Sequence, residues 1–303
     1  PISLVNGMPL GIELAASWTR MLSCQEIVGE IKKSIDFLES NMRRLPDRHR
    51  SMRAVFSYSW DLLNADERNT LMNLSLIKGP FTLDTAQEVG QTDLDMMTSL
   101  VDKSLVQAYT TFSEETQSIQ VYSLHEITRH YANQLLKESI NHWEKANVRY
   151  TQWFINLLIY QHDPLYGSHQ FQAAENIHFA YNDMLYAWQE SLSSFGWNSQ
   201  DIIKATHALG KYFQLQGFDR LGADAFNKAL NALPAAAPAE LYIAIQLRLS
   251  GFLYRLSSYS ESEELAQQVK ESAEALNDQS TLRKALLILA QNANKTGRFD
   301  ESQ

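Results

Sequence analysis

The chain contains a single cysteine, Cys24, in 303 residues. It therefore has no internal disulfide, no CxxC redox motif and no cysteine-based zinc site. This absence is typical of a reducing compartment, and we expect a cytoplasmic location. No run of about 18 consecutive apolar residues occurs, so the sequence predicts no membrane-spanning helix. The first residues lack a basic start and carry Glu13 within an apolar run, so we expect no signal peptide there.

Positive charge is also scarce. The chain has 26 Lys and Arg against 35 Asp and Glu, a formal net charge of −9. Because affinity for phosphate backbones comes from clustered Lys and Arg, this balance disfavours a chain whose main role is to bind nucleic acid. The one basic cluster lies within residues 43–53 and is interrupted by Asp47. Its simplest interpretation is a solvated linker; alternatively, Arg48, Arg50 and Arg53 contact a nucleotide phosphate or an acidic partner.

The motifs of ATP hydrolysis and zinc catalysis are missing as well. In the phosphate-binding loop G-x-x-x-x-G-K-[ST] a first glycine and a final hydroxyl are required. The one Gly-Lys pair, Gly210-Lys211, lacks the first glycine and is followed by Tyr212. His125 and His130 are five positions apart, so they do not share the helical face that an HExxH zinc site needs. We predict no catalytic residue and no metal site, and we do not expect this chain to be an enzyme.

The remaining composition is that of an ordinary globular protein. Hydrophobic residues make up 45% and charged residues 20% of the chain, so disorder is not expected. The length suffices for roughly two or three domains. Hydrophobic periodicity predicts a mainly α fold, with domain boundaries that divide the chain into residues 1–40, 41–137, 138–199 and 200–303.

Residues 1–40 have the pattern of helices. Pro9 suits the first turn of a helix, where its missing N–H costs nothing. Leucines and a tryptophan then recur at every fourth position along one face. Ser23 and Glu26 have the spacing of a capping box, which predicts a second helix.

Residues 41–137 combine helices with one β-hairpin. We predict helices over residues 52–63, 64–74, 83–89 and 94–101, strands over 105–109 and 119–122, and a final helix opened by Leu124-His125-Glu126. Several helices followed by one hairpin are typical of a winged-helix domain.

From residue 139 onward the sequence predicts only helices, near residues 140–160, 171–192, 200–216, 220–233, 239–257, 260–277 and 280–296. Turns with a central aromatic residue recur at nearly equal intervals, at Phe218, Tyr259 and Phe299. Gly210 and Gly251 precede the first two turns by the same distance along the chain. This periodicity predicts a superhelix of TPR-like helix pairs over residues 200–303, joined by connecting helices over 138–199. We expect the sequence to be truncated at both ends.

Several motifs in order resemble those of the signal-transduction ATPases with numerous domains (STAND), which include plant resistance proteins, apoptotic ATPases and bacterial AfsR- or LuxR-type regulators. The segment Gly7 to Ala16, GMPLGIELAA, is similar to the end of their NB-ARC-like nucleotide-binding module. The segments RHRSMR, SWDLL, FTL, LVDKSLV and LHE, between Arg48 and Glu126, then follow the order of their winged-helix domain.

This resemblance implies a function and two nucleotide contacts. Residues 1–40 would be the helical end of the nucleotide-binding module, with Pro9 against the adenine. His125 would match the histidine that touches the β-phosphate of ADP, although Glu126 replaces the usual Asp. The full-length parent would bind ADP or ATP with Mg and hydrolyse ATP slowly, whereas no cofactor is expected for this chain alone. Its partners would be the upstream module, a protein or small-molecule inducer on the repeats, and further copies of itself on activation.

Two other interpretations stay open. A stand-alone TPR-like scaffold would bind proteins and never contact nucleotide. A DNA-binding winged-helix regulator would read a groove with its third helix, but residues 93–103 carry three Asp and one Lys. Phosphates would repel that helix, so direct DNA contact by it is disfavoured. For His125, the plain alternative is a histidine that caps the start of its helix.

Overall fold

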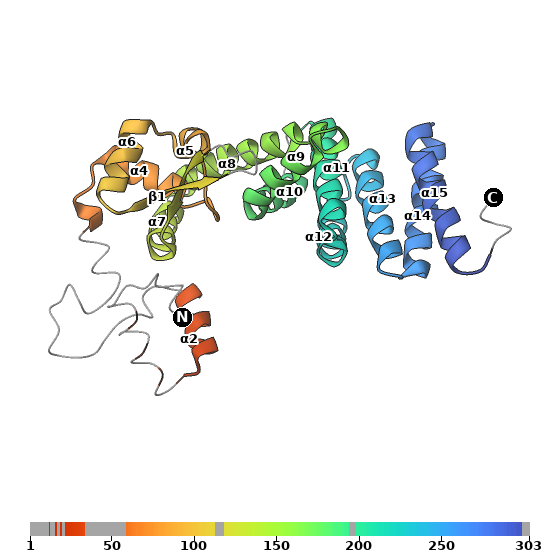
Figure 1. The fold of residues 1–303 in the computed structure, drawn as a ribbon, viewed down its shortest axis with the longest axis horizontal. Helices are drawn as coiled ribbons and strands as arrows, with labels where there is room; N and C mark the ends of the chain where they lie inside the picture. Colours follow the sequence, from red (N-terminus) through yellow and green to blue (C-terminus); the bar gives the residue numbers. More distant parts are fainter. Residues whose placement is uncertain are drawn as a thin grey trace. The chain divides into compact units, whose positions relative to one another are not determined.

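The computed structural model describes residues 12, 16, 19, 22–33, 59–112, 118–193 and 198–298. Its internal contacts divide the chain into two compact units, Pro1–Trp153 and Phe154–Gln303. Most of the predicted nucleotide-module helices and the whole basic cluster lie outside the described residues. The mainly α architecture with one hairpin, predicted from the sequence, is confirmed (Figure 1).

The capping box near the N-terminus forms as predicted. The Glu26 carboxylate accepts a hydrogen bond from the Ser23 N–H at 2.8 Å, and Ser23 Oγ accepts from the Glu26 N–H at 3.3 Å. Both bonds satisfy backbone donors that a helix start leaves unpaired. Helix α2 (Cys24–Lys33) follows directly.

After α2, the described part of the first unit includes α4 (Ala65–Leu74), α5 (Leu83–Gly90), α6 (Leu94–Asp102) and α7 (Glu126–Glu138). The side chains of Asn64, Thr82 and Asp93 each accept a backbone N–H bond at the starts of α4, α5 and α6. The order and limits of these helices agree closely with the sequence prediction.

The hairpin is longer than predicted, and a third segment, at Phe81, pairs with its second strand. Strand β1 (Val106–Phe112) pairs with β2 (Ser118–Leu124) antiparallel. Phe81, which lies outside the hairpin, and Tyr122 of β2 exchange two backbone hydrogen bonds of 2.9 and 2.8 Å. Their rings stack with centroids 6.2 Å apart. This bridge attaches the segment between α4 and α5 to the sheet, a contact that short-range sequence patterns did not reveal.

A single apolar core joins the hairpin to the helices. Its members share nearly complete burial and come from α4 to α7, both strands and the bridge: Leu71, Leu74, Phe81, Val89, Met97, Leu100, Val106, Val121, Ile127 and Leu136. Helix α7 packs on α4, and α5 lies against β2. Burial of these side chains supplies most of the driving force for folding of the unit.

Helix α8 (Ile140–Tyr160) contains the point at which the contacts divide the chain. The second unit continues with η4 (Pro164–Tyr166), α9 (Gln170–Phe179), α10 (Tyr181–Ser193), α11 (Ser199–Gln216), α12 (Asp219–Ala232), α13 (Ala239–Arg255), α14 (Tyr259–Ala275) and α15 (Gln279–Lys295). The single helix predicted over 171–192 was wrong. It is two helices, α9 and α10, broken at Ala180.

The helices from α11 onward form a regular repeat and lie side by side in Figure 1. The first helices of the successive pairs, α11, α13 and α15, begin at equal intervals along the chain. A residue in the left-handed conformation closely follows each of them: Gly217, Ser257 or Gly297.

This register corrects the alignment predicted from the aromatic turns. In the structure Phe218 is equivalent to Ser258 rather than to Tyr259, because both precede the second helix of a pair. Gly210 therefore corresponds to Ser250 and Ala290 rather than to Gly251. All three equivalent residues are small, which suits closely packed helix pairs.

Aromatic side chains fill the interior of the second unit. Trp188, Tyr212, Phe213, Phe226 and Phe252 are at most 1% exposed. Phe252 lies edge-on to Phe213 and tilted against Phe226, with centroids 6.1 and 5.5 Å apart. Such offset arrangements suit the ring quadrupoles. These ring contacts join the pair formed by α11 and α12 to α13.

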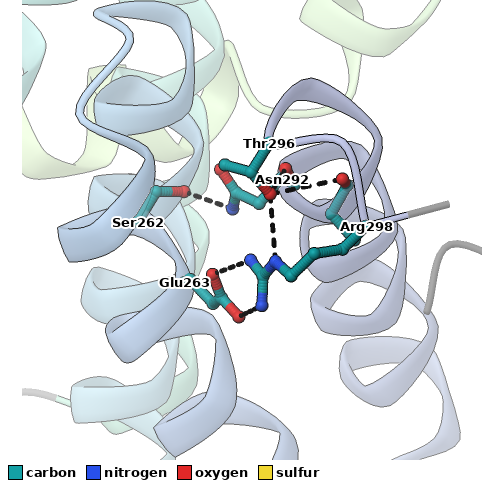
Figure 2. A network of polar contacts seen from close by, with 6 residues as sticks. Ser262, Glu263, Asn292, Thr296 and Arg298 are labelled. Atoms are coloured by element: carbon teal, nitrogen blue, oxygen red, sulfur yellow. Dashed lines mark hydrogen bonds and ion pairs between the residues drawn. The ribbon is translucent and has the colours of Figure 1, made fainter. Parts of the chain in front are cut away.

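A chain of hydrogen bonds links the last three helices, and Figure 2 shows its part between α14 and α15. Asn292 of α15 donates to Ser262 Oγ of α14 at 2.9 Å, and Ser262 donates to the Ser250 carbonyl of α13 at 2.8 Å. All three residues are fully buried. Arg298, by contrast, makes a two-pronged ion pair with Glu263 nearer the surface. The buried bonds fix how α15 is aligned along α14.

Candidate functional site

His125 is the predicted nucleotide contact that the structure describes. Pro9, Arg48, Arg50 and Arg53 lie outside the described residues, so their proposed contacts stay predictions.

His125 lies where the second strand of the hairpin ends and α7 begins. It is the N-cap residue of α7, and its carbonyl accepts from the Arg129 N–H at 2.8 Å. Its side chain makes no capping hydrogen bond to that helix. The interpretation of His125 as a helix-capping side chain was therefore wrong.

The ring of His125 is partly exposed. Its partial burial lowers the pKa of the imidazole below the usual value, because burial disfavours the charged form. At neutral pH the imidazole is an uncharged group with one donor and one acceptor nitrogen.

The neighbouring Glu126 is paired within its own helix. Its carboxylate accepts a hydrogen bond from the Arg129 guanidinium, and Arg129 also donates to the carbonyls of Ile77, at 3.2 Å, and Lys78. Through Arg129, the first turn of α7 is fixed to the turn that follows α4. This pairing holds the backbone of His125 in place.

Helix α6 presents an acidic surface. Asp93, Asp95 and Asp102 are exposed along it, and Leu94 is 54% exposed. The sole basic residue at its end, Lys103, is bound to the Glu67 carboxylate of α4 at 2.5 Å. The surface of α6 is therefore negative, and it would repel a phosphate backbone.

Glu67 is the polar centre of the helix cluster. Its side chain is 4% exposed and accepts hydrogen bonds from Lys103, from Ser99 Oγ at 2.7 Å and from the Asn64 N–H at 2.9 Å. Burial raises the pKa of Glu67, but the bonds from Lys103, Ser99 and Asn64 outweigh it and hold the pKa below its usual value. Glu67 therefore stays charged and connects α4 to α6.

This arrangement of helices around a hairpin matches a family model. The model describes a winged helix-turn-helix domain and covers residues 63–137. Residues 63–137 form a winged helix-turn-helix domain. The domain contains α4 to α7, both strands and His125, so the winged helix predicted from the sequence is confirmed.

Relatives of the chain include regulators. An HTH-type transcriptional regulator, so named, of Mycobacterium tuberculosis (strain ATCC 25618 / H37Rv) is 29% identical over 173 residues, which cover 55% of this chain and 19% of that protein. An uncharacterized protein of the same organism is 32% identical over 143 residues, covering 45% of this chain and 35% of that protein. The chain thus spans about a fifth of the length of the first relatives it matches. Together with the winged helix-turn-helix domain, these relatives support a regulatory role.

A solved structure is also similar. It is a Signal Transduction ATPase with Numerous Domains (STAND) protein with a tetratricopeptide repeat sensor from Pyrococcus horikoshii, and the alignment covers 96% of this chain and 57% of that one. The identity is 12% and the TM-score is 0.28.

The described part of the chain holds neither a metal-ligand cluster nor a helix that could span a bilayer. Nowhere among the described residues do three or more His, Cys, Asp or Glu side chains gather as metal ligands would. None of the described helices has the length and apolarity that crossing a bilayer requires. The winged helix-turn-helix domain offers a partly exposed histidine and an acidic helix surface.

Sequence reasoning missed a pocket in the second unit. It lies among the first helices of the repeats and is lined in part by Tyr166, His207, Arg248 and Lys284. The repeat period of the helix pairs was the sequence signal that could have located this pocket. In the register set by the starts of α11, α13 and α15, equivalent positions hold His207, Leu247 and Leu287, and all three line this pocket.

Proposed function

We propose that this chain is the regulatory and sensor portion of an ATP/ADP-switched STAND regulator. The winged helix-turn-helix domain relays the nucleotide state, and the helical repeats bind the inducing protein or ligand. The observation that carries the proposal is the place of His125: it follows the hairpin of a winged helix-turn-helix domain, in the order of motifs that the family shares. The chain itself is not an enzyme in this proposal.

The chemistry of His125 suits a diphosphate contact. Its imidazole is neutral, partly exposed and not engaged in capping α7. An N–H of such a ring donates to a phosphate oxygen, and a nearby anion also favours its protonated form. The ion pair of Glu126 with Arg129 holds the backbone beneath it.

The remaining predicted contacts complete this switch in the parent protein. ADP with Mg would join the upstream module to the winged helix-turn-helix domain. Pro9 would lie near the adenine, and Arg48, Arg50 or Arg53 would lie near a phosphate or an acidic partner.

The acidic surface of α6 supports a relay rather than a DNA-reading role for this domain. Any effect on transcription, as the names of the mycobacterial relatives suggest for them, would then come from another part of the parent. Inducer binding to the repeats would weaken the contact with ADP, and ATP would allow copies of the cytoplasmic protein to associate.

The test compares nucleotide affinity with and without the histidine. A protein extended upstream through the expected phosphate-binding loop is titrated with ADP by calorimetry. His125→Ala is expected to weaken ADP binding roughly tenfold, about 1.4 kcal/mol. His130→Ala, on the same helix, is the matched control and should leave the affinity unchanged.

Two results would overturn the proposal. An extended protein that ignores ADP and ATP is not a nucleotide switch, and a helical scaffold would describe it better. If His125→Ala and His130→Ala weaken ADP binding equally, the loss of affinity comes from a general disturbance of α7. It is then not evidence that His125 touches the nucleotide.

A further inference from the structure

The repeats contain a pocket with an unusual charge balance. It has a volume of about 270 Å³ and lies among α11, α13, α15 and the η4 turn. Its lining includes Arg248, Arg255 and Lys284 and contains no Asp or Glu among the described residues. In a chain with a net charge of −9, a concave surface of only positive charge indicates an anionic occupant.

Arg248 is the residue whose charge is not balanced. Its Nε donates to His207 Nδ1 at 3.3 Å, and its Nη2 donates to the His207 carbonyl at 3.2 Å and to the Tyr166 hydroxyl. All of these acceptors are neutral. Within the described part of the chain, Arg248 makes no ion pair with a carboxylate, and its Nη1 nitrogen makes no hydrogen bond. A partly buried guanidinium without a counter-charge carries a desolvation cost that a bound anion would offset.

His207 binds Arg248 through two hydrogen bonds but supplies no negative charge to balance the guanidinium. Burial, helped by the charges of Arg248, Lys284 and His162, lowers the pKa of His207 to about 3. The ring is therefore neutral at physiological pH, with Nδ1 as an acceptor and the proton on the other nitrogen. Two of its atoms orient Arg248, which keeps its full charge.

Gly210 makes room for the arginine stem. A Cβ built at Gly210 would lie 2.7 Å from Cδ of Arg248, closer than such atoms approach unless the arginine shifts. Arg248 thus lies directly against the backbone of α11, with its position set by Gly210 on one side and by Tyr166 and His207 at its head. A side chain restrained in this way is pre-organised for binding.

The other cations differ in how far they are balanced. Arg255 is paired with Asp219, with Nε 2.5 Å from Oδ1. Lys284 is exposed and attracted by Asp278 at the start of its helix, without an ion pair among the described residues. Arg248 and Lys284 are therefore the two groups left in the lining to meet an anion.

The rest of the pocket is largely apolar. Leu247, Phe252, Leu287 and Ile288 contribute to its lining, and Leu287 is 59% exposed. The volume is close to the lower end of the range of about 300–1,000 Å³ that small-molecule sites occupy. It suits one compact molecule better than a helix of a partner protein.

We propose that this pocket binds a small organic anion, a carboxylate or phosphate on an apolar body, with the anionic group on Arg248 and Lys284 and the body on the leucine-lined wall. This inference rests on the proposed sensing role of the repeats, and it assigns that role a place and a ligand class.

The experiment uses 2-naphthoate as the probe and its neutral amide, 2-naphthamide, as the uncharged match. Binding of each to the 303-residue chain is measured by calorimetry. We expect 2-naphthoate to bind at least about tenfold more tightly than the amide. Arg248→Gln should remove most of this preference, and Lys284→Gln should weaken 2-naphthoate several-fold. Arg283→Gln removes a charge from the same helix outside the pocket lining and should change nothing.

Folding is checked by thermal melting of each variant, because Arg248 also contacts Tyr166 and His207. If Arg248→Gln does not fold, the exposed Lys284 still decides the outcome. Equal binding of the acid and the amide overturns the proposal, as does an equal effect of Lys284→Gln and Arg283→Gln. So does a result in which a short glutamate-rich peptide binds through Arg248 and 2-naphthoate does not, since the site would then accept a protein.

The result of the 2-naphthoate experiment can be distinguished from the result of the ADP titration that tests the proposed function. A chain that binds 2-naphthoate while the extended protein ignores ADP has the pocket without the switch. An extended protein that needs His125 for ADP while this chain ignores 2-naphthoate keeps the switch and loses the proposed ligand class.

Discussion

At the scale of single residues, His125 and Glu67 show how partners decide the effect of burial on charge. Both belong to the winged helix-turn-helix domain. Burial lowers the pKa of His125, so its imidazole is neutral. Burial also raises the pKa of Glu67, but the bonds from three donors outweigh it and hold the carboxylate in the charged form. The charged carboxylate of Glu67 connects α4 to α6 through its bonds to Ser99 and Lys103.

Replacing Glu67 is therefore expected to destabilise the first unit. Glu67→Gln keeps the shape but removes the charge that Lys103 and Ser99 bind, at a cost of about 2 kcal/mol. Glu126→Gln is the matched control, because its pair with Arg129 is more exposed and should contribute below about 1 kcal/mol. Urea denaturation monitored by circular dichroism measures both. Equal losses would contradict the role given to Glu67.

The same substitution has a defined pH dependence. The folded-state pKa of Glu67 lies below its ordinary value of 4.5, so the folded state binds a proton less readily than the unfolded state. Its stabilisation is fully present above the unfolded pKa and is lost as the pH falls through the folded pKa. The stability difference between wild type and Glu67→Gln should thus be constant near neutral pH and shrink in acid. A difference that grew in acid would contradict the lowered pKa.

At the scale of elements, the sequence predicted the positions of most helices well. It predicted less well which residues of successive repeats are equivalent. Caps and apolar periodicity placed α4 to α8 and α11 to α15, because both signals are local. The break at Ala180 was missed, since neither Gly nor Pro marks it. The repeat was misaligned by a single position, because the aromatic residues Phe218 and Tyr259 are conspicuous but occupy different positions in their turns. The left-handed residues, which set the period, include Ser257, and serine gives little hint of that conformation.

Replacing Ser257 with glycine is expected to raise the stability of the fold. Its φ is 65°, close to the 67° of Gly217 at the equivalent turn. A residue with a Cβ pays about 1 kcal/mol there, which glycine avoids. Ser257→Gly should raise the midpoint of thermal unfolding, and Gly217→Ala, the reciprocal change, should lower it. A fall in the midpoint with Ser257→Gly would show that the Ser257 side chain contributes more than its backbone costs.

The buried hydrogen bond between Asn292 and Ser262 (Figure 2) predicts an order of effects on stability. Ser262→Ala leaves the Asn292 amide without its acceptor in a site closed to water, at a cost of about 1–3 kcal/mol. Arg298→Met removes the more exposed pair with Glu263, at a cost of up to about 1 kcal/mol. Chemical denaturation compares the two variants. If Arg298→Met were the more damaging, the end of α15 would depend on its surface pair rather than on the buried bonds.

At the scale of the whole molecule, charge is distributed unevenly, and this could not be read from composition. The net charge of −9 indicated poor affinity for nucleic acid. It did not show that the described lining of the pocket on the repeats is free of carboxylates, because that requires side chains from α11, α13 and α15 to be brought together. Nor did it show that Lys103 is bound to Glu67. The acidic exposed face of α6 was predictable, since its Asp residues are local to one helix.

This charge distribution predicts that the chain does not bind duplex DNA. At about 50 mM salt, where phosphate contacts are strong, fluorescence anisotropy with labelled DNA should show no binding by the wild type. The double substitution Asp95→Lys and Asp102→Lys reverses the charge of the exposed α6 surface and should create binding that weakens as salt is added. Glu271→Lys with Glu274→Lys makes the same change in net charge on α14 and should bind far less. Salt-sensitive binding by the wild type would show that the winged helix-turn-helix domain binds DNA. Equal binding by the two variants would show that net charge alone, and not the surface of α6, determines DNA binding.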